Sequence, residues 1–454
     1  MLDKRQIIEH LRVADILISD QNVKGSFTYM DFGLKLRDRI YSQAILFLEK
    51  MDFQRVQLSD IVEKANILKI DHINQISKNY FPIEGSENLM AAGHEIPFYL
   101  FIKNLTKHGK LNKYPSGFFH FGSVFRYPKK TKFPFSIGEK RTFLECYFTY
   151  TEPKDEEYCF NLATEWNRRF LEDFLHLPLV ESVRPLITNK RFSKKTQCID
   201  TITPLGRTVN TGMTYLHDDI FSKVFGVKVR VDGTNKKTVK CVHFGISDNT
   251  YFSYLINSHD GLGFRLLTDV APYCVQVILN KDCTEHDLGV IKLFKFLEIQ
   301  NISYKTHSNA EGDVKKIKKQ SIVRGIPMMI SVSKKEGDIT LSVVYRGDLR
   351  IQEIQNLKII NEILLQNDSE IIDVFNKRKN DSVVYCNTVK RINSAVSSGK
   401  VAKIHLNQKD ESVLLLESQI DSGEILGFRE SQTKGKDLIS GESTSIIAYI
   451  SRRI

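Results

Sequence analysis

The spacing of apolar residues in the first half of the chain predicts helices separated by strands. Apolar residues recur three and four positions apart in residues 40–51, 96–109 and 156–177, which is the spacing of a helix that packs one face on a core. The predicted strands are residues 53–62, 117–128 and 140–150. The last two strands flank a basic loop, and this arrangement suits a ligand that carries phosphate.

The second half of the chain alternates between strand-like and helix-like stretches. The predicted strands are 270–279, 326–333 and 339–345, and the predicted helices are 286–300 and 354–367, with a lysine-rich segment at 314–320. This alternation predicts a small α/β domain. A chain of 454 residues is long enough for about three domains, and we place them at residues 1–270, 271–370 and 371–454.

A content of 41% hydrophobic and 26% charged residues is that of an ordinary globular protein. No apolar run reaches the roughly 20 residues of a membrane-spanning helix, and the first twenty residues lack the apolar block of a signal peptide. We therefore expect a cytoplasmic protein without a membrane span. The net charge of +11 suits a polyanionic partner such as nucleic acid, but a basic surface without such a partner explains the charge equally well.

The seven cysteines form no C-x-x-C pair and no cluster with histidine at the spacing of zinc ligands. His94, His259 and His286 likewise show no ligand spacing. We therefore expect reduced, buried thiols and no metal site.

Three segments follow one another in an order and at separations that carry a family resemblance. They are GSVFRYP…KRTFLECYF (122–148), GRTVNTGMTYLHDDIFSKVFGVKV (206–229) and HDGLGFRLLTDVAPYCVQVI (259–278). The first resembles motif 2 of prolyl-tRNA synthetase of the archaeal and eukaryotic type, the second its segment Gly-Arg-x-x-Gln-x-x-Thr-Ser-His…Phe-Ser-Lys-x-Phe, and the third its motif 3. Further similarity at 324–333, 343–348 and 440–454 extends the resemblance over about residues 30–454.

The resemblance implies a mixed α/β and α+β protein of several domains. Residues 1–270 would form a class II aminoacyl-tRNA synthetase core with an antiparallel sheet of about six strands. An α/β anticodon-binding-like domain (271–370) and a small C-terminal α+β domain (371–454) would follow. The resemblance also implies a homodimer through motif 1, at about residues 30–62, although Ser59 replaces the proline of that motif.

The resemblance assigns ATP-binding roles to two arginines of motif 2. Arg126 falls on the arginine that contacts the α-phosphate, and Arg141 matches a second arginine. Three neighbours depart from the family, because Pro128 and Thr142 replace acids and Glu139 replaces an arginine. Since activation depends on placement and charge stabilisation, these changes weaken the expected site.

Motif 3 can be aligned in two registers. The ungapped alignment places Asp269 where the family has the arginine that binds the γ-phosphate, whereas a shifted alignment uses Arg265. Arg265 is therefore, after Arg126, the second candidate for catalysis and ATP binding. An active enzyme needs it, or an equivalent cation, to point into the ATP cleft.

The substrate loop of the family, Arg-Pro-Thr-Ser-Glu, aligns with residues 91–95 and retains only Glu95. Glu95 either holds the amino group of a small ligand or, in the interpretation we favour, stabilises the first turn of the following helix. Asn210 and Tyr215 replace the family's Gln and His. We therefore do not expect a proline pocket.

Seven basic residues lie in the region that reads the anticodon in the family. They are Lys315, Lys316, Lys318, Lys319, Arg324, Arg346 and Arg350. We expect contacts with RNA phosphates here, and the alternative is a solvated basic face.

We favour a degenerate paralogue that serves as a tRNA-binding, RNA-binding or regulatory pseudo-synthetase and needs no cofactor. The alternative is a divergent but active aminoacyl-tRNA or amino-acid ligase of the prolyl-tRNA type, which uses ATP and Mg²⁺. A third hypothesis, less favoured because several site residues are lost, is the only prolyl-tRNA synthetase of a fast-evolving organism. The expected partners are tRNA or another RNA and a second copy of the chain, with a protein partner as a further option.

Overall fold

A computed structural model describes residues 4–19, 27–74, 76–111, 113–126, 140–188, 192–231, 235–308 and 314–454. The chain divides into two compact units. The α/β unit contains the described residues of Met1–Asp20, Phe27–Gln43 and Tyr254–Lys377, and the sheet unit contains those of Ala44–Ser253 and Arg378–Ile454. The basic loop between the two strands of motif 2 lies outside the described residues. The division into three domains stays a prediction.

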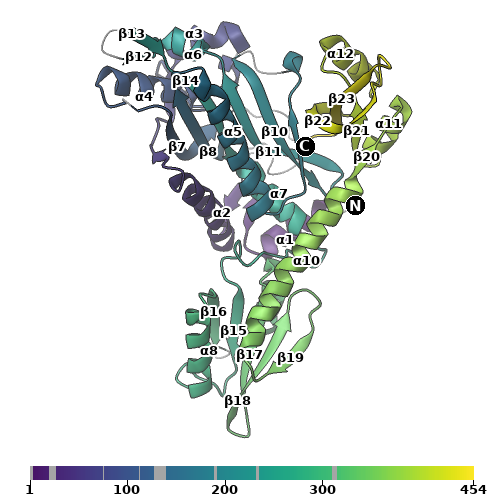
Figure 1. Cartoon of the computed structure of the whole chain (residues 1–454). Coiled ribbons are helices and arrows are strands. Elements are labelled where there is room, and N and C mark those ends of the chain that lie inside the picture. The colour runs from purple at the N-terminus through teal and green to yellow at the C-terminus, as the bar shows by residue number, and fades with distance from the viewer. Residues whose placement is uncertain are drawn as a thin grey trace. The chain divides into compact units, whose positions relative to one another are not determined.

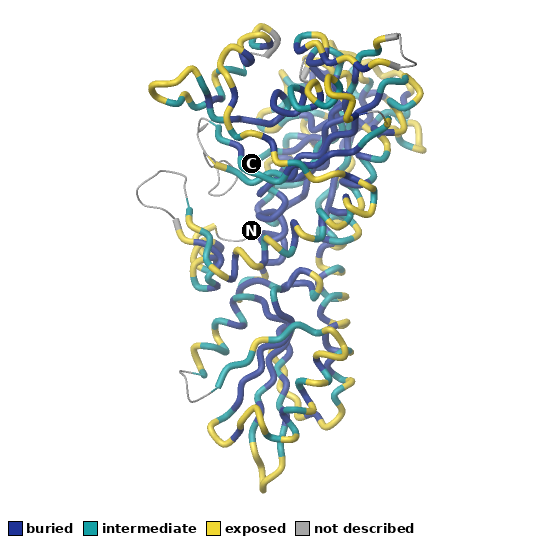
Figure 2. The backbone as a smooth tube through the Cα atoms, turned by 90° about the vertical axis from the view of Figure 1, so that its left-hand side faces the viewer, coloured by how far each residue is buried: buried dark blue, intermediate teal, exposed yellow. Residues whose placement is uncertain are grey.

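The sheet unit is built on an eleven-stranded sheet in the order β20-β21-β23-β22-β9-β10-β11-β14-β8-β7-β3. Six neighbouring strands are antiparallel: β9 (Leu179–Val183), β10 (Ser193–Thr203), β11 (Arg207–His217), β14 (Lys240–Ser247), β8 (Lys140–Tyr150) and β7 (Ser116–Phe125). Figure 2 shows the buried residues that run along these strands. This part of the sheet confirms the predicted antiparallel core.

Helices α4 (Glu95–Lys107) and α5 (Lys154–Arg168) cover opposite faces of this sheet (Figure 1). Side chains alternate between the two faces along a strand, so Tyr147 and Phe148 of β8 point in opposite directions. Tyr147 stacks on Phe98 of α4 with ring centroids 3.8 Å apart, whereas Phe244, the neighbour of Phe148 in β14, contacts Trp166 of α5. The predicted core helix with the only tryptophan is therefore confirmed, and it continues as a π-helical turn (Arg169–Phe174).

The predicted strand at 53–62 is wrong as a continuous element. Only β3 (Gln54–Arg55), parallel to β7, and β4 (Ile61–Glu63), in a separate small sheet, have strand structure. The backbone between them turns to His120, whose Nδ1 atom lies 3.2 Å from the Leu58 amide nitrogen. The other described elements between residues 50 and 240 are β5 (Phe81–Pro82), β6 (Asn88–Met90), α3 (Lys64–Asn74), α6 (Ile220–Phe225), β12 (Lys228–Val231), β13 (Asn235–Thr238) and the 3₁₀ helices Ile76–Asn79 and Leu186–Thr188.

The C-terminal segment extends the same sheet. Its elements are β20 (Val383–Tyr385), α11 (Val389–Ser397), β21 (Val401–His405), α12 (Asp410–Gln419), β22 (Glu424–Lys436) and β23 (Ser443–Ser451). β22 joins β9 through one residue pair, Phe428 and Val183. The side chain of Arg453 then donates two hydrogen bonds to the buried carboxylate of Asp200 in β10, at 3.0 and 3.1 Å.

The α/β unit holds a five-stranded sheet in the order β16-β15-β17-β18-β19. Its strands are β15 (Val275–Leu279), β16 (Tyr304–Ser308), β17 (Met328–Lys335), β18 (Asp338–Tyr345) and β19 (Ile351–Ile354). β15 is parallel to both neighbours, and helices α8 (Leu288–Ile299) and α9 (Val314–Arg324) lie between strands in the sequence. The predicted α/β pattern is confirmed.

The α/β unit also contains α1 (Lys4–Val13), β1 (Leu17–Ser19) and β2 (Phe27–Tyr29). Three helices contribute residues to both units: α2 (Asp31–Glu49), α7 (Asp248–Ser258) and α10 (Lys358–Ser382). In the part of the chain that the structure describes, no helix combines the length and the apolar character needed to cross a membrane.

We expect Arg453→Met to destabilise the sheet unit by about 3–5 kcal/mol, because it leaves the carboxylate of Asp200, whose side chain is 0% exposed, without its cation. Arg452→Met is the matched control, since the side chain of Arg452 hydrogen-bonds only the hydroxyl of Ser422 among the described residues and its removal costs about 1 kcal/mol. Urea unfolding followed by circular dichroism measures both. Equal midpoints for the two variants would contradict the role of the Arg453 pair.

Candidate active site

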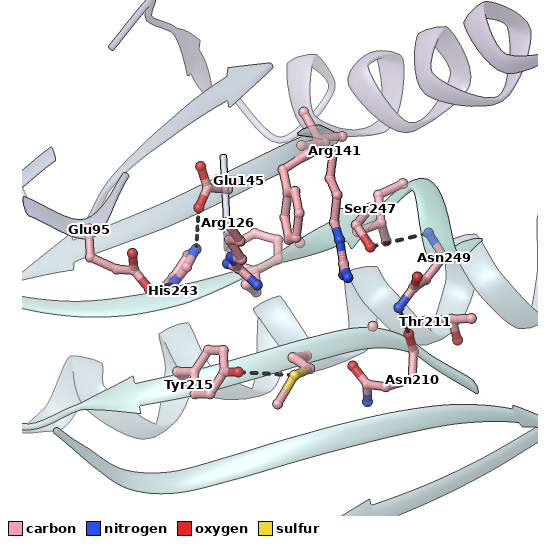
Figure 3. Close-up of a pocket in the computed structure, with 17 residues that line it drawn as sticks. Glu95, Arg126, Arg141, Glu145, Asn210, Thr211, Tyr215, His243, Ser247 and Asn249 are labelled. Atoms are coloured by element: carbon pink, nitrogen blue, oxygen red, sulfur yellow. Dashed lines mark hydrogen bonds and ion pairs between the residues drawn. The ribbon is translucent and has the colours of Figure 1, made fainter. Parts of the chain in front are cut away.

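A cleft of about 710 Å³ opens on the face of the sheet unit that α4 covers. Strands β8, β11 and β14 form its floor, and the first residues of α4 and α7 lie at its edges. Figure 3 shows the side chains that meet there. The polar residues that line the cleft are Glu95, Arg126, Arg141, Glu145, Asn210, Thr211, Tyr215, His243, Ser247 and Asn249.

Strand alternation and one glycine determine which side chains reach the cleft. Residues 141, 143 and 145 of β8 share one face, as do residues 243, 245 and 247 of β14. Gly245 pairs with Glu145 on one side and with Met213 on the other. Its φ is 152°, and a Cβ atom there would lie 2.0 Å from the carbonyl oxygen of Leu144. A side chain at this position would therefore clash with the backbone of β8, so glycine allows β14 to pair closely with β8.

Two arginines share one side of the cleft. Arg126 donates from Nε to the carbonyl oxygen of Ala92 at 2.6 Å, and its guanidinium lies 5.1 Å from the centre of the Phe143 ring. Burial and, after it, the positive charge of Arg126 lower the pKa of Arg141 to about 10. Two guanidinium groups that repel each other in a half-buried cleft favour an anion between them.

The polar residues near Arg141 are fixed by hydrogen bonds to the backbone. The amide of Thr142 donates to the Oδ2 atom of Asp248 at 2.7 Å. The next residue, Asn249, donates from Nδ2 to the carbonyl oxygen of Asn210 at 3.1 Å. The first turn of α7 therefore contributes the side-chain amide of Asn249 to the lining of the cleft, while the carboxylate of Asp248 accepts a hydrogen bond from the backbone of β8.

A buried network of acids and histidines lies at the other end of the cleft. Glu145 is 3% exposed, and its Oε2 atom accepts a hydrogen bond of 2.5 Å from Nδ1 of His94. Nε2 of His243 lies 3.8 Å from Oε1 of Glu145, and Nδ1 of the same ring lies 3.8 Å from Oε1 of Glu95. Burial alone would raise the pKa of Glu145, but the positive partners His94 and His243 outweigh it and lower the pKa. Burial likewise opposes the charge of His94, and Glu145 raises its pKa. The carboxylate and the imidazolium thus stabilise each other.

Aromatic rings hold this network in place. The ring of His243 stacks on Tyr147 at 4.5 Å, and Tyr147 in turn stacks on Phe98. Tyr215, across the strand pair from His243, directs its hydroxyl to the sulfur of Met213 at 3.0 Å. This end of the cleft is therefore narrow, aromatic and polar.

The structure brings together most of the cleft residues that the sequence singled out. Arg126, Arg141, Glu95, Asn210 and Tyr215 all line the cleft. Glu95 is the first residue of α4, where a negative charge is favourable, and it also faces His243. Both interpretations of Glu95 therefore fit its position, and the roles of these residues stay predictions.

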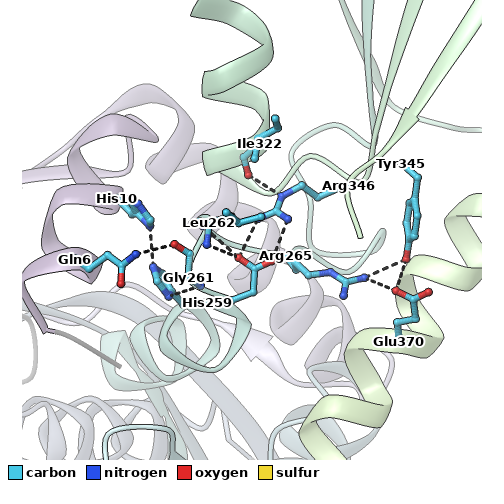
Figure 4. Close-up of polar contacts among 12 residues, drawn as sticks. Gln6, His10, His259, Gly261, Leu262, Arg265, Ile322, Tyr345, Arg346 and Glu370 are labelled. Carbon is cyan, nitrogen blue, oxygen red and sulfur yellow. Dashed lines mark hydrogen bonds and ion pairs between the residues drawn. The ribbon is translucent and has the colours of Figure 1, made fainter. Parts of the chain in front are cut away.

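Arg265 and Asp269, the two motif 3 candidates, belong to the α/β unit. Arg265 donates from Nη2 to Glu370 at 2.9 Å and to the hydroxyl of Tyr345 at 3.0 Å (Figure 4). The backbone carbonyl of Asp269 accepts a hydrogen bond from Arg39. Neither residue is among those that line the cleft, whereas Asn249, near the start of α7, is one of them.

The seven predicted RNA-binding residues differ in how exposed their side chains are to solvent. Lys315, Lys316 and Lys319 of α9 are exposed, Lys318 is half-buried, and Arg350 is exposed. Arg324 is held by Asp15 at 2.5 Å and lies over the ring of Phe32.

Arg346 is only 1% exposed and binds Asp260 through two nitrogens at 2.9 and 3.0 Å (Figure 4). These contacts give Arg324 and Arg346 a structural part in the α/β unit. The RNA-binding prediction therefore rests on the α9 lysines and Arg350.

Comparison with solved structures identifies the architecture as the fold of class II aminoacyl-tRNA synthetases. The chain matches Giardia lamblia prolyl-tRNA synthetase in complex with prolyl-adenylate with a TM-score of 0.87 and 15% identity, covering 99% of this chain and 98% of that one. Cryptosporidium parvum prolyl-tRNA synthetase complexed with L-proline and AMP matches with a TM-score of 0.84 and 16% identity, covering 98% and 96%.

Within that class, the chain resembles prolyl-tRNA synthetases, as the sequence predicted. Proline–tRNA ligase of Methanopyrus kandleri is 24% identical over 353 residues, which cover 75% of this chain and 72% of that protein. The corresponding ligases of Malacoplasma penetrans and Methanosarcina mazei are 21% and 22% identical, cover 90% and 98% of this chain, and are themselves covered to 88% and 95%. No protein-family model matches the chain.

Sequence reasoning missed Glu145, His243 and Asn249. Glu145 stands two residues after Phe143 and four after Arg141 in a predicted strand, so alternation alone could have placed it on the same face. His243 and Asn249 had no such signal, because β14 and the start of α7 were not predicted as separate elements. The pairing of β14 with β8 and β11 brings them into the cleft.

We expect Arg346→Met to destabilise the α/β unit by about 3–5 kcal/mol, because it leaves the carboxylate of Asp260 beside an apolar side chain. Arg350→Met, at an exposed position of the same unit, should change stability by about 0.5 kcal/mol or less. Thermal and urea unfolding of the whole chain compare them. An Arg346→Met protein as stable as the unchanged protein would make Arg346 an RNA-binding candidate again.

Proposed function

We propose that this chain is an ATP-dependent aminoacyl-tRNA ligase of the prolyl-tRNA type. The observation that carries the proposal is the pairing of Arg126 and Arg141 in one cleft with Glu95. The two arginines stand at positions where the resemblance places phosphate contacts, and Glu95 is the retained acid of the substrate loop. This arrangement favours the ligase over the pseudo-synthetase that the sequence alone led us to prefer.

The proposed chemistry needs an anion site beside a site for an amino acid. In the first step the amino acid's carboxylate attacks the α-phosphorus of ATP and pyrophosphate leaves. Arg126 and Arg141 supply positive charge where negative charge develops on the phosphate, which is the main way that such sites lower a barrier. Glu95 and His243, at the narrow end of the cleft, then face the amino group and side chain of the substrate.

The residues of the cleft fit the phosphates of ATP better than they fit Mg²⁺. Magnesium prefers oxygen ligands at about 2.0–2.1 Å, most often carboxylates together with phosphate oxygens. The carboxylates that line the cleft are Glu95 and Glu145, and both face histidines. We therefore assign the arginines to ATP and assign no described residue to Mg²⁺.

The relatives supply the proposed amino acid and acceptor. They are named proline–tRNA ligases, and one neighbouring structure is complexed with L-proline and AMP. Proline and tRNA are thus the first substrates to test. Because Asn210 and Tyr215 replace the family's Gln and His, the other amino acids belong in the same assay.

A second candidate function is a tRNA-binding protein that does not activate an amino acid. It is favoured by the position of Arg265, which an active enzyme was expected to direct at ATP and which is instead held by Glu370. In this case the exposed lysines of α9 carry the function, through contacts with RNA phosphate. The homodimer and the cytoplasmic location stay predictions under both candidates.

The first test is calorimetric titration of the purified chain with ATP, with and without proline and Mg²⁺. We expect Arg126→Ala to weaken ATP binding roughly tenfold to a hundredfold, because it removes a charged hydrogen-bond partner worth about 1.5–3 kcal/mol. Arg350→Ala is the control, at an exposed site in the other unit. ATP–pyrophosphate exchange with each amino acid then identifies the substrate.

Two results decide between the candidate functions. ATP binding that needs Arg126, together with exchange, supports the ligase. No binding at millimolar ATP rejects the ligase and leaves the tRNA-binding candidate.

The lysines of α9 have a separate test. We expect the double change Lys316→Ala and Lys319→Ala to weaken tRNA binding and to lower the slope of log K against log salt by about 0.7–0.9 for each phosphate that the variant no longer neutralises. Lys434→Ala with Lys436→Ala, at exposed positions of β22, controls for the removal of charge alone. An equal change of slope in both double variants would mean that α9 binds no specific phosphate.

A further inference from the structure

Three residues from separate segments of the sheet unit meet beside Glu145. Asp60 precedes β4, His94 precedes α4, and His120 lies in β7. One potential ligand atom from each residue lies within 4.8 Å of the other two. The rings of His94 and His120 have their centroids 4.2 Å apart, and Nε2 of His94 is 3.2 Å from Oδ1 of Asp60.

The two histidines are buried, and one ring nitrogen has no hydrogen-bond partner. His94 and His120 are both 0% exposed. Among the described residues, no atom hydrogen-bonds Nε2 of His120. Gly122, two residues further along the same face of β7, leaves room at this nitrogen, because a Cβ atom at 122 would lie 2.3 Å from it. A buried nitrogen without a partner is costly unless something binds it.

The tautomer of His120 can be argued from its other nitrogen. Nδ1 lies 3.2 Å from the Leu58 amide and 3.4 Å from the carbonyl oxygen of Val56. If Nδ1 accepts from the Leu58 amide, the proton on Nε2 has no acceptor. If Nδ1 instead carries the proton and donates to Val56, Nε2 keeps a lone pair that a metal ion can use, and the Leu58 amide gives up its hydrogen bond to the ring.

The orientation of His94 also suits a metal ligand. Its Nδ1 donates to the buried carboxylate of Glu145 at 2.5 Å, which leaves Nε2 on the side of Asp60. Histidines that bind metals commonly donate their other ring N–H to a carboxylate, which fixes the ring and strengthens the ligand. Glu145 therefore has the position of an outer partner, while Asp60, His94 and His120 have the positions of ligands.

We propose that Asp60, His94 and His120 form a binding site for Zn²⁺ or a similar divalent transition metal. Zinc takes imidazole and carboxylate ligands at about 2.0–2.2 Å, and two such ligands on a tetrahedral ion lie about 3.4 Å apart. The 3.2 Å between Nε2 of His94 and Oδ1 of Asp60 already matches this spacing, and the ligand atom of His120 lies within 4.8 Å of both. Imidazole ligands disfavour Mg²⁺ and Ca²⁺.

The site is open to a fourth ligand. The side chain of Asp60 is 45% exposed, so water or a substrate group can reach the metal from this side. The two histidines and Glu145 close the other side. A site with three protein ligands and an open position is typical of a zinc ion that contacts a substrate.

The test titrates the whole chain, freed of metal with a chelator, with Zn²⁺ by calorimetry and with Co²⁺ by visible absorption. We expect a single Zn²⁺ per chain and the intense visible bands of tetrahedral Co²⁺. Asp60→Asn and His120→Gln should each weaken Zn²⁺ binding at least about tenfold, and Glu145→Gln about 10–100-fold. His286→Gln, at an exposed histidine of the α/β unit, should leave binding unchanged.

The proposal is overturned if the unchanged chain binds no stoichiometric Zn²⁺, or if Asp60→Asn and His120→Gln bind it as well as His286→Gln does. Millimolar Mg²⁺ that displaces Zn²⁺ would also overturn it. If His120→Gln fails to fold by circular dichroism, Asp60→Asn decides, because its half-exposed side chain can be changed without opening the core. Metal binding is read without any assay of ligase activity, so the result is independent of the proposed function.

Discussion

A buried carboxylate, that of Glu145, determines how the segments around the cleft are arranged. A carboxylate removed from water needs positive partners and hydrogen bonds, and here His94 and His243 supply them. His94 directly precedes α4, so its bond to Glu145 fixes the start of that helix and the position of Glu95. The loop before His94 offers the carbonyl oxygen of Ala92, to which Arg126 donates. One buried charge on β8 thus positions the substrate loop, a helix and the arginine that we assign to phosphate.

The sequence predicts those residues of the cleft that lie in a regular apolar pattern or in a motif shared with the family. Arg126 and Arg141 belong to a strand pair with strong alternation, Glu95 begins a clear amphipathic helix, and all three line the cleft. Their roles stay predictions. Arg265 was a candidate because a shifted alignment of motif 3 places it at the arginine that binds the γ-phosphate. Its partner Glu370 is 105 residues away, and no local pattern reports such a pairing. The same reason hid Asn249, which reaches the cleft only through strand pairing.

Element types were predicted better than the limits of the sheet. Helices α4, α5 and α8 and strands β7 and β8 appear close to their predicted ranges, because each has a clear period of apolar residues. The prediction of a strand at 53–62 was wrong, because the backbone of this segment pairs with β7 and with the ring of His120, both of which lie far away in the sequence. The joining of the C-terminal strands to the core sheet was also missed. It rests on one residue pair between β22 and β9, on backbone hydrogen bonds of Thr208 with Arg452 and Ile454, and on the ion pair of Arg453 with Asp200. None of these contacts has a local signature in the sequence.

The pairing of Arg453 with Asp200 also sets an order of events during synthesis of the protein. The two residues are 253 positions apart, and the largest segment of the α/β unit, Tyr254–Lys377, is made between them. While a ribosome is still making the C-terminal segment, β10 is already available, but Asp200 lacks the two hydrogen bonds that Arg453 donates. Contacts of such long sequence separation form slowly. The sheet unit is therefore completed last, although most of its strands are synthesised first.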